Sequence, residues 1–266
     1  MIASRRSLLA RAQTQAIGAV LQRRNPTLEL KYVWVESEGD RRTDASLAHV
    51  GGKGLFSQAV EQALLDEHAD IAVHSLKDMP TQTTPGLTIA AVPMRADVRD
   101  CLITRHDAAT IDALPAHAVV GTSSPRRAAQ IKRIRDDIHI TPLRGNVDTR
   151  LRKVLEAHEC DATLLAMAGL QRMGSSQHAT RPIDTALMLP AAAQGALAIQ
   201  CRADDHVTLL KCLGLKDRTA AAGDDQEIEG HPGERTRGRA GGGEASSRPP
   251  RPRTDGEACE PGPASD

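Results

Sequence analysis

Short apolar runs alternate with segments of helical periodicity over residues 1–213, and this alternation is the strongest constraint on the fold. Apolar residues at helical spacing predict helices, whereas short continuous apolar runs bounded by Gly or Pro predict buried strands. The predicted helices cover residues 7–24, 55–65, 146–158 and 204–213. The predicted strands cover residues 28–35, 70–74, 88–92, 101–104, 118–120, 138–140, 162–166 and 196–201. The alternation favours an α/β fold with a largely parallel sheet, and its two cycles predict two lobes with a cleft between them.

Length and charge exclude several classes of protein. The chain has 266 residues, enough for about two domains. Its 34 Lys and Arg balance its 34 Asp and Glu, and it contains one Trp, one Tyr and one Phe, so neither charge nor stacking favours nucleic-acid binding. No apolar stretch approaches the roughly 20 residues of a membrane span, and the start of the chain does not resemble a secretory signal. We therefore expect a cytoplasmic monomer that binds neither nucleic acid nor membrane.

The cysteines and histidines show no metal-ligand spacing. The five cysteines are Cys101, Cys160, Cys201, Cys212 and Cys259, and no two of them form a C-x-x-C pair. The first three lie in or beside apolar runs, which predicts buried free thiols. We expect no metal site.

The end of the predicted strand at residues 70–74 carries the most informative polar pair. Lys77 and Asp78 follow this apolar run directly, and Pro80 ends the element. Ligands of open α/β sheets bind beyond the carboxyl ends of strands. A neighbouring ammonium keeps Asp78 ionised while a closed pocket raises its pKa, a combination typical of a carboxylate that transfers protons. Taken alone, the pair favours a surface ion pair after a strand, because paired charges are often only structural.

A second strand end, at residues 121–127, has the features of an anion site. Its sequence is Gly-Thr-Ser-Ser-Pro-Arg-Arg. Ser123 or Ser124 can cap a helix whose first position is Pro125, and the free N–H groups of that helix then face an anion. The two arginines add bidentate donors for carboxylate or phosphate. A capped helix with solvated arginines is the alternative.

Basic residues recur at other strand ends and helix starts. Arg144 and Arg150 flank a helix start that Asn146 can cap, Arg5 precedes the first helix, and Lys53 lies in a Gly-rich loop. Cations near a helix N-terminus are unfavourable unless an anion offsets them. In a chain of zero net charge, these loops predict a ligand with several carboxylates or phosphates.

Three common site motifs are missing from the sequence. The loop around Lys53 lacks the P-loop spacing, no G-x-G-x-x-G follows a strand, and G-x-S-x-G does not occur. These observations disfavour a nucleotide site of either type and nucleophilic serine catalysis.

Together, these motifs resemble those of the porphobilinogen deaminase (hydroxymethylbilane synthase) family. The resemblance covers about residues 2–213. The matching stretches are residues 4–7, 50–56, 69–80, 121–127, 143–150, 168–174 and 189–202.

The resemblance implies a fold, an activity and a set of site residues. The family has two periplasmic-binding-protein-like lobes hinged around a cleft, and it condenses four porphobilinogen molecules head to tail with release of ammonia. Asp78 matches the catalytic carboxylate, which assists the departure of ammonia and stabilises cationic pyrrole intermediates. The residues that match the binding of dipyrromethane cofactor and substrate, or the lining of the cleft, are Arg5, Ser7, Lys53, Ser75, Lys77, Thr122, Ser123, Ser124, Arg126, Arg127, Arg144, Gly145, Arg150, Arg172 and Gln194.

The sequence departs from the family after the last matching helix. The resemblance implies a third domain in which a Gly-Gly-Cys cysteine anchors the dipyrromethane, but here a Gly-, Pro- and Arg-rich segment follows, and Cys259 is not in that context. His49 and Ala193 stand where the family commonly has Lys and Gly. We expect one lobe from residues 1–95 and 194–213, a second from residues 96–193, and a disordered tail over residues 214–266 whose composition resembles a shifted reading frame.

Two other functions stay open at this point. One is a truncated homologue that binds anionic pyrroles without turning them over. The other is a solute-binding module for polycarboxylates.

Overall fold

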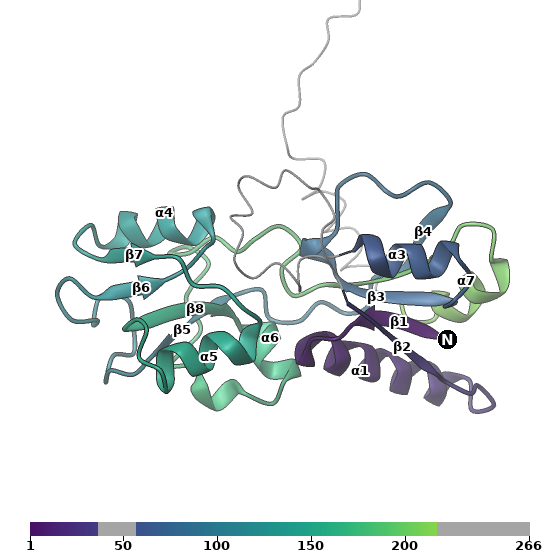
Figure 1. The fold of residues 1–266 in the computed structure, drawn as a ribbon, viewed down its shortest axis with the longest axis horizontal. Helices are drawn as coiled ribbons and strands as arrows, with labels where there is room; N and C mark the ends of the chain where they lie inside the picture. Colours follow the sequence, from purple (N-terminus) through teal and green to yellow (C-terminus); the bar gives the residue numbers. More distant parts are fainter. Residues whose placement is uncertain (37–56, 217–266) are drawn as a thin grey trace, which may run out of the picture. The chain divides into compact units, whose positions relative to one another are not determined.

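Two β-sheets organise the part of the chain that the computed structural model describes, residues 1–36 and 57–216 (Figure 1). The first sheet has the order β2-β1-β3-β9-β4 and the second has the order β5-β8-β6-β7. The strands of the first sheet are β1 (Ile2–Arg5), β2 (Tyr32–Val35), β3 (Ile71–Ser75), β4 (Leu87–Ala91) and β9 (Leu197–Arg202). Those of the second are β5 (Asp100–Thr104), β6 (Val119–Gly121), β7 (His139–Thr141) and β8 (Ala162–Ala166). Both sheets belong to one compact unit.

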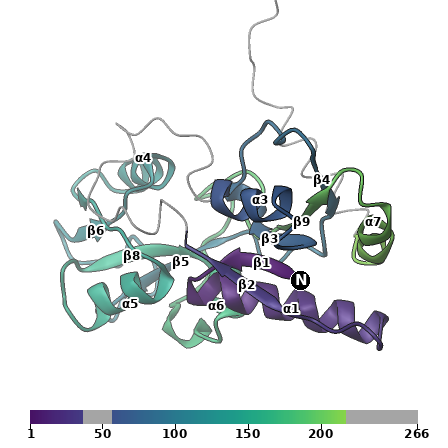
Figure 2. The ribbon, with the colours of Figure 1, turned by 45° about the vertical axis from the view of Figure 1, so that its right-hand side comes forward.

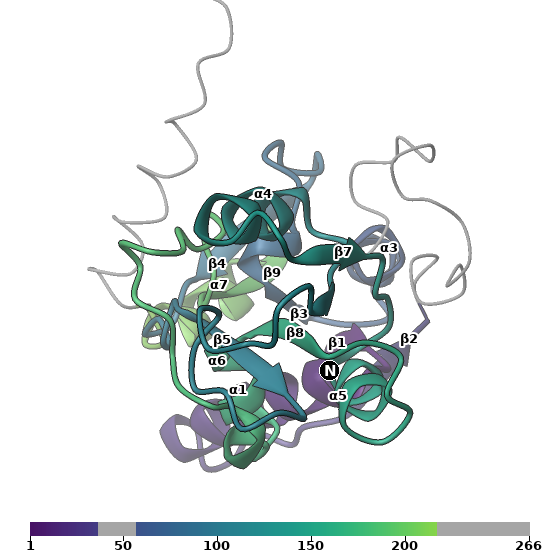
Figure 3. The same ribbon diagram turned by 90° about the vertical axis from the view of Figure 1, so that its left-hand side faces the viewer.

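Helices cover both faces of each sheet. Ile17 of α1 (Leu8–Arg24) packs on Ile71 and Val73 of β3, while α3 (Gln58–Leu65) packs on the opposite face (Figure 2). In the second sheet, α4 (Pro125–Ile134) and α5 (Val147–Leu155) take opposite faces in the same way (Figure 3). The remaining helices are α6 (Met167–Arg172), α7 (His206–Leu213) and the short 3₁₀ turns η1 (Leu76–Asp78) and η2 (Ser176–His178). No helix of the described residues is long and apolar enough to cross a membrane.

The prediction of a largely parallel sheet holds only in part, because both sheets combine parallel and antiparallel pairs. β9 runs antiparallel to β3 and to β4, and β5 runs antiparallel to β8. The first residue of β9, Leu197, pairs with Ser75, the last residue of β3, and Asp100 pairs with Ala166 in the same way. β9 and β5 each arrive from the other sheet, so they begin at the carboxyl ends of their neighbours and run back along them. The two segments that join the sheets therefore pass the strand ends where ligands of α/β proteins bind.

Most of the predicted elements occur within a few residues of their expected positions. The main difference is β2, which begins at Tyr32 and not at residue 28, because Leu28 and Leu30 pack against the core from outside the strand. The predicted start of the second helix at residues 55 and 56 lies outside the described residues, as do Lys53, His49 and residues 217–266. The predicted lobe boundaries at 95–96 and 193–194 fall in the segments between the sheets and stay a prediction.

Helix starts follow the capping pattern of the sequence. Ser7 accepts a hydrogen bond from the Ala10 N–H, and Ser124 accepts one from the Arg127 N–H with Pro125 at the first helical position. Asn146 occupies the N-cap position of α5, but its side chain makes no capping hydrogen bond. Capping therefore fixes where α1 and α4 begin.

Gly195 lies just before β9, and a substitution there tests how tightly the connecting segments pack. Its φ is +91°, and a Cβ there would lie 2.6 Å from the Ala96 carbonyl oxygen. Gly195→Ala should lower the free energy of unfolding by about 2–4 kcal/mol in urea denaturation, because conformational strain adds to a backbone clash. Gly174→Ala is the matched control, since Gly174 has φ +64° with no atom within 4 Å, and should cost about 1 kcal/mol. Equal losses for the two variants would contradict the packing argument.

Candidate functional site

A cavity of about 350 Å³ lies where strand ends from both sheets meet. Its polar lining comes from the ends of β1 and β3, from the loops that follow β6 and β7, and from α4, α5 and α6. Leu165, Ala168 and Ala196 are among its apolar lining residues. The antiparallel direction of β9 and β5 brings the connecting segments to the same place.

The charges around this cavity are strongly one-sided. Asp78 is its one acidic lining residue among those that the structure describes. The basic lining residues are Arg5, Lys77, Arg127, Arg144, Arg150 and Arg172. Because the whole chain has no net charge, this excess is local and suits an anionic ligand.

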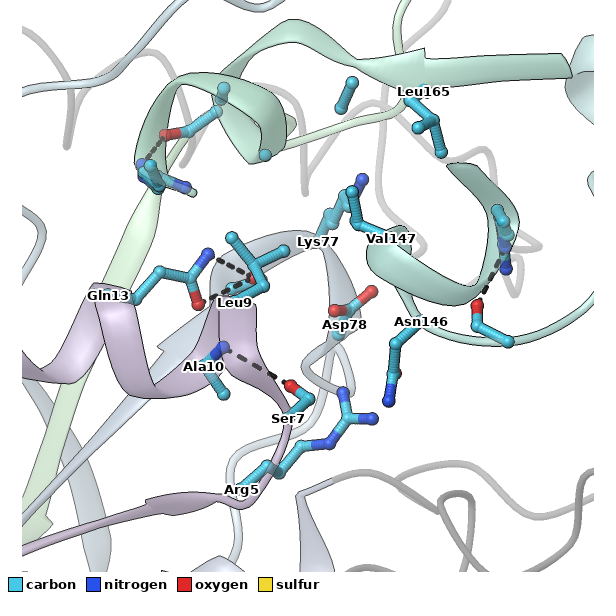
Figure 4. Close-up of a pocket in the computed structure, with 18 of the residues that line it drawn as sticks. Arg5, Ser7, Leu9, Ala10, Gln13, Lys77, Asp78, Asn146, Val147 and Leu165 are labelled. Atoms are coloured by element: carbon cyan, nitrogen blue, oxygen red, sulfur yellow. Dashed lines mark hydrogen bonds between the residues drawn. The ribbon is translucent and has the colours of Figure 1, made fainter. Parts of the chain in front are cut away.

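The turn η1 carries Lys77 and Asp78 into the cavity. Leu76 is buried and donates its N–H to the Ala196 carbonyl, which fixes the turn to the start of β9. Ser75 is held by Gln13 of α1, whose Nε2 donates to the Ser75 hydroxyl at 3.1 Å. Figure 4 shows Asp78 near Asn146, with Lys77 and Arg5 on either side.

Lys77 is reachable from the cavity, yet protein groups surround its ammonium. Its Nζ donates to the Gln194 Oε1 at 3.3 Å. Desolvation lowers the Lys77 pKa, and Asp78 opposes that shift. Lys77 is therefore a cation that a bound carboxylate would stabilise.

The loop of residues 121–127 fits tightly against its neighbours. A Cβ on Gly121 would lie 2.7 Å from the Cys160 Sγ, so only glycine fits there. Ser123 lines the cavity and donates its hydroxyl to the Leu143 carbonyl at 3.2 Å. Thr122 accepts the Ser124 N–H. Thr122 and Ser124 therefore hold the loop, and Ser123 is the hydroxyl that faces the cavity.

The two arginines of this loop are bound to a buried carboxylate. Arg127 donates through Nη2 to the Asp100 Oδ1 at 2.6 Å and through Nε to Oδ2 at 3.3 Å, and Arg126 donates to Oδ2 at 2.7 Å. Burial acts to raise the Asp100 pKa, but the arginines outweigh it, so the pKa is lowered. Arg127 lines the cavity, whereas Arg126 does not and also donates to the Leu189 carbonyl.

Arg150 and Arg172 are held by backbone carbonyls. Arg150 donates through Nε to the Gly145 carbonyl at 2.8 Å, and Arg172 donates through Nη2 to the Gly195 carbonyl at 2.5 Å. Desolvation lowers the pKa of both guanidinium groups, and Arg127 adds to the effect on Arg150. The carbonyls orient these cations before any ligand binds.

The structure brings most of the sequence-predicted site residues together. Those that line the cavity are Arg5, Ser7, Ser75, Lys77, Asp78, Ser123, Arg127, Arg144, Gly145, Arg150 and Arg172. Thr122, Ser124, Arg126 and Gln194 lie behind the lining, and Lys53 lies outside the described residues.

Three residues at the site, Gln13, Asn146 and Asp100, were not predicted as site residues from the sequence. Gln13 is a polar residue on the buried side of α1, and that position is a signal that sequence alone provides. Asp100 is the first residue of an apolar strand. No local sequence pattern distinguishes a buried carboxylate from a solvated one at that position.

Comparison with known proteins identifies the family. Residues 1–209 match the family model described as "Porphobilinogen deaminase, dipyromethane cofactor binding domain". The chain is 50% identical over 207 residues to porphobilinogen deaminase of Sorangium cellulosum, covering 77% of this chain and 68% of that protein. It is 44% identical over 224 residues to the Streptococcus sanguinis protein of the same name, covering 83% and 73%. The chain belongs to the porphobilinogen deaminase family.

A solved structure supports the fold of this porphobilinogen deaminase family member. A periplasmic substrate-binding protein of an ABC transporter from Coxiella burnetii matches with a TM-score of 0.50 and 10% identity, over 85% of this chain and 96% of that one. The predicted α/β fold of periplasmic-binding-protein type is thereby confirmed.

Dipyrromethane is the cofactor of the porphobilinogen deaminase family, and the cavity fits it in part. Guanidinium, ammonium and hydroxyl groups match its carboxylates, and the apolar lining matches its rings. The four described cysteines are buried, and none lines the cavity; Cys259 lies outside the described residues. The described residues therefore fit the cofactor without supplying its anchor.

His74, beside Ser75, gives this family member a testable pH dependence. It is buried near Glu61 and Gln200, and its Nε2 has no partner within the described residues. Desolvation lowers the His74 pKa from 6.5 to about 4, so the unfolded chain gains a proton first as the pH falls. The free energy of unfolding should therefore fall by about 3 kcal/mol as the pH is lowered from 6.5 to 4.

Urea denaturation at several pH values measures this loss. His74→Gln should remove most of the slope between pH 6.5 and 4, whereas His139→Gln, which replaces an exposed imidazole, should keep it. An unchanged slope in His74→Gln would show that another group titrates in this range.

Proposed function

We propose that the chain is a hydroxymethylbilane synthase, which condenses four porphobilinogen molecules into a linear tetrapyrrole and releases ammonia at each step. One observation carries the proposal: among the described residues, six cationic side chains and a single carboxylate, Asp78, line a cavity at the strand ends. Family membership and relatives named porphobilinogen deaminase support the same activity.

The lining suits the charge of this substrate. Each porphobilinogen carries an acetate and a propionate, and a chain of pyrroles adds two carboxylates per ring. Arginine binds carboxylates through two parallel N–H donors, and five of the six cations are arginines. A cavity of about 350 Å³ is within the usual range of small-molecule sites, so it can hold pyrrole rings together with their acidic side chains.

Asp78 is placed for the proton transfers of the condensation. The C–N bond of the protonated aminomethyl group breaks, neutral ammonia leaves with the bonding electron pair, and positive charge develops on the pyrrole and its methylene carbon. A carboxylate in the cavity stabilises that charge. When the free α-carbon of another pyrrole forms the new C–C bond, that carbon loses a proton, which Asp78 can accept.

The bound dipyrromethane would supply the pyrrole end to which the first substrate is joined. Arg5, Ser7, Ser123, Arg144 and Arg150 would hold its carboxylates, since they face the cavity from both sheets. Their guanidinium and hydroxyl groups orient the pyrrole rings and replace water around the carboxylates.

A second candidate function is binding of anionic pyrroles without turnover. It is favoured by the four described cysteines, since all are buried and none lines the cavity. Intact mass spectrometry of the full chain separates the two candidates. A covalent dipyrrole adduct would support the enzyme, whereas an unmodified chain that binds porphobilinogen would support binding alone.

Asp78→Asn tests the catalytic assignment. Removing the charge should reduce ammonia release from porphobilinogen by at least about a hundredfold, because the proton acceptor and the stabilising anion are both lost. Porphobilinogen binding should persist, because the six cations stay in place. Asp148→Asn, an exposed carboxylate on α5, is the control and should keep wild-type release. Full activity in Asp78→Asn would refute the assignment.

Arg150→Gln tests the carboxylate-binding role. Loss of one charge-assisted contact should weaken porphobilinogen binding by about tenfold in calorimetry. Arg152→Gln changes an exposed arginine on the same helix and should bind as the wild type does. Equal effects of the two variants would mean that only the net charge of α5 matters.

The cytoplasmic location and the monomeric state stay predictions. Analytical ultracentrifugation of the full chain would test the monomeric state.

A further inference from the structure

Asp100 is a fully buried carboxylate that does not line the cavity. It is the first residue of β5, where the chain enters the second sheet, and its side chain is 0% exposed. Arg126, Arg127 and Gln194 all donate hydrogen bonds to it. A carboxylate with this many donors is held in one orientation, and it holds its partners in turn.

Gln194 connects Asp100 to the other sheet. Its Nε2 donates to the Asp100 Oδ1 at 3.0 Å and to the Val98 carbonyl at 2.7 Å. These bonds fix the amide so that its Oε1 accepts from the Lys77 Nζ at 3.3 Å. A continuous chain of contacts therefore runs from Asp100 in the second sheet to Lys77 at the end of β3 in the first.

The same carboxylate sets the orientation of Arg127. Two of the three guanidinium nitrogens, Nε and Nη2, are taken by Asp100. Arg127 lines the cavity, and its Nη1 makes no hydrogen bond within the described residues. A planar guanidinium bound on one edge presents its remaining N–H groups in a fixed direction.

We propose that Asp100 is a positioning residue: through Arg127 directly and through Gln194 to Lys77, it holds two cations in the orientation that binds the carboxylates of the ligand. The inference rests on the proposed function for the identity of that ligand. It assigns to Asp100 a role that neither the cavity lining nor the sequence motifs reveal.

A simple counter-ion role makes the opposite prediction. If Asp100 only neutralised charge, its removal would leave the cavity more positive and tighten the binding of an anion. If Asp100 positions the cations, removal leaves Lys77, Arg126 and Arg127 repelling one another, and binding weakens. The direction of the change in affinity therefore separates the two roles.

The first test needs no ligand. In ¹⁵N–¹H spectra of the full chain, the Arg127 Nε–H, assigned by its loss in Arg127→Lys, should exchange slowly because Asp100 binds it. In Asp100→Asn, exchange should accelerate by about tenfold or more. Asp97→Asn removes a nearby carboxylate that pairs with Arg99, and it should leave the Arg127 signal unchanged. An unchanged signal in a folded Asp100→Asn would overturn the proposal.

The second test measures porphobilinogen binding against pH. Asp78, Arg127, Asp100 and Arg126 are the charged groups that act on Lys77, and Asp100 raises the Lys77 pKa. Asp100→Asn should weaken porphobilinogen binding by about tenfold. It should also lower the upper pH limit of that binding. In a Lys77→Arg background that shift should disappear, because arginine does not titrate there. Unchanged or tighter binding in Asp100→Asn would overturn the proposal.

A further variant covers the case in which Asp100→Asn does not fold. Gln194→Met keeps both arginine pairs of Asp100 and breaks the link to Lys77. In this variant the upper pH limit of porphobilinogen binding should move, while the Arg127 Nε–H should still exchange slowly. An unchanged pH limit would overturn the link from Asp100 through Gln194 to Lys77. If the wild-type chain bound no porphobilinogen, the proposed function would fail, while the Arg127 exchange experiment would still decide the positioning role.

Discussion

Repulsion among the cations around the cavity is the constraint on which the rest of the site depends. Within residues 1–36 and 57–216, five arginines and one lysine line a space of about 350 Å³ together with one carboxylate. Desolvated cations are unfavourable unless they are paired or hydrogen-bonded. Groups behind the cavity lining offset this repulsion. Asp100 binds Arg127, backbone carbonyls bind Arg150 and Arg172, and Gln194 binds Lys77. These partners are backbone or buried groups, so the cations are oriented before a ligand arrives.

The features that sequence could predict are those fixed by near neighbours in the chain. The caps at Ser7 and Ser124 and the exposed Lys77–Asp78 turn follow from residues a few positions away. Asp100 could not be found in this way, because its partners lie 26, 27 and 94 residues along the chain. The motif of residues 121–127 predicted two ligand-binding arginines. Both bind Asp100, but Arg127 also lines the cavity, whereas Arg126 donates to the Leu189 carbonyl instead. A local sequence pattern identifies a cationic residue, but it does not show which group in the fold pairs with it.

Strand direction is a second feature that local sequence patterns cannot predict. Alternating strands and helices predict parallel pairing only when consecutive strands join the same sheet. β5 and β9 follow segments that come from the other sheet, so each begins at the carboxyl ends of its neighbours and runs antiparallel. This departure has a consequence for function. It places Asp100 and Gln194, which lie where the chain crosses into each sheet, directly behind the cavity, where they can join the two halves of its lining.

The distribution of cations between the sheets limits which ligands the cavity can favour. Arg5 and Lys77 belong to the first sheet and its turn, whereas Arg127, Arg144, Arg150 and Arg172 belong to elements around the second. A ligand with one carboxylate would bring opposite charge to the cations on one side only. A ligand with carboxylates at both ends would bring opposite charge to both groups of cations at once and so reduce the repulsion between them. The placement of charge on two separate sheets then favours polycarboxylated ligands over simple acids.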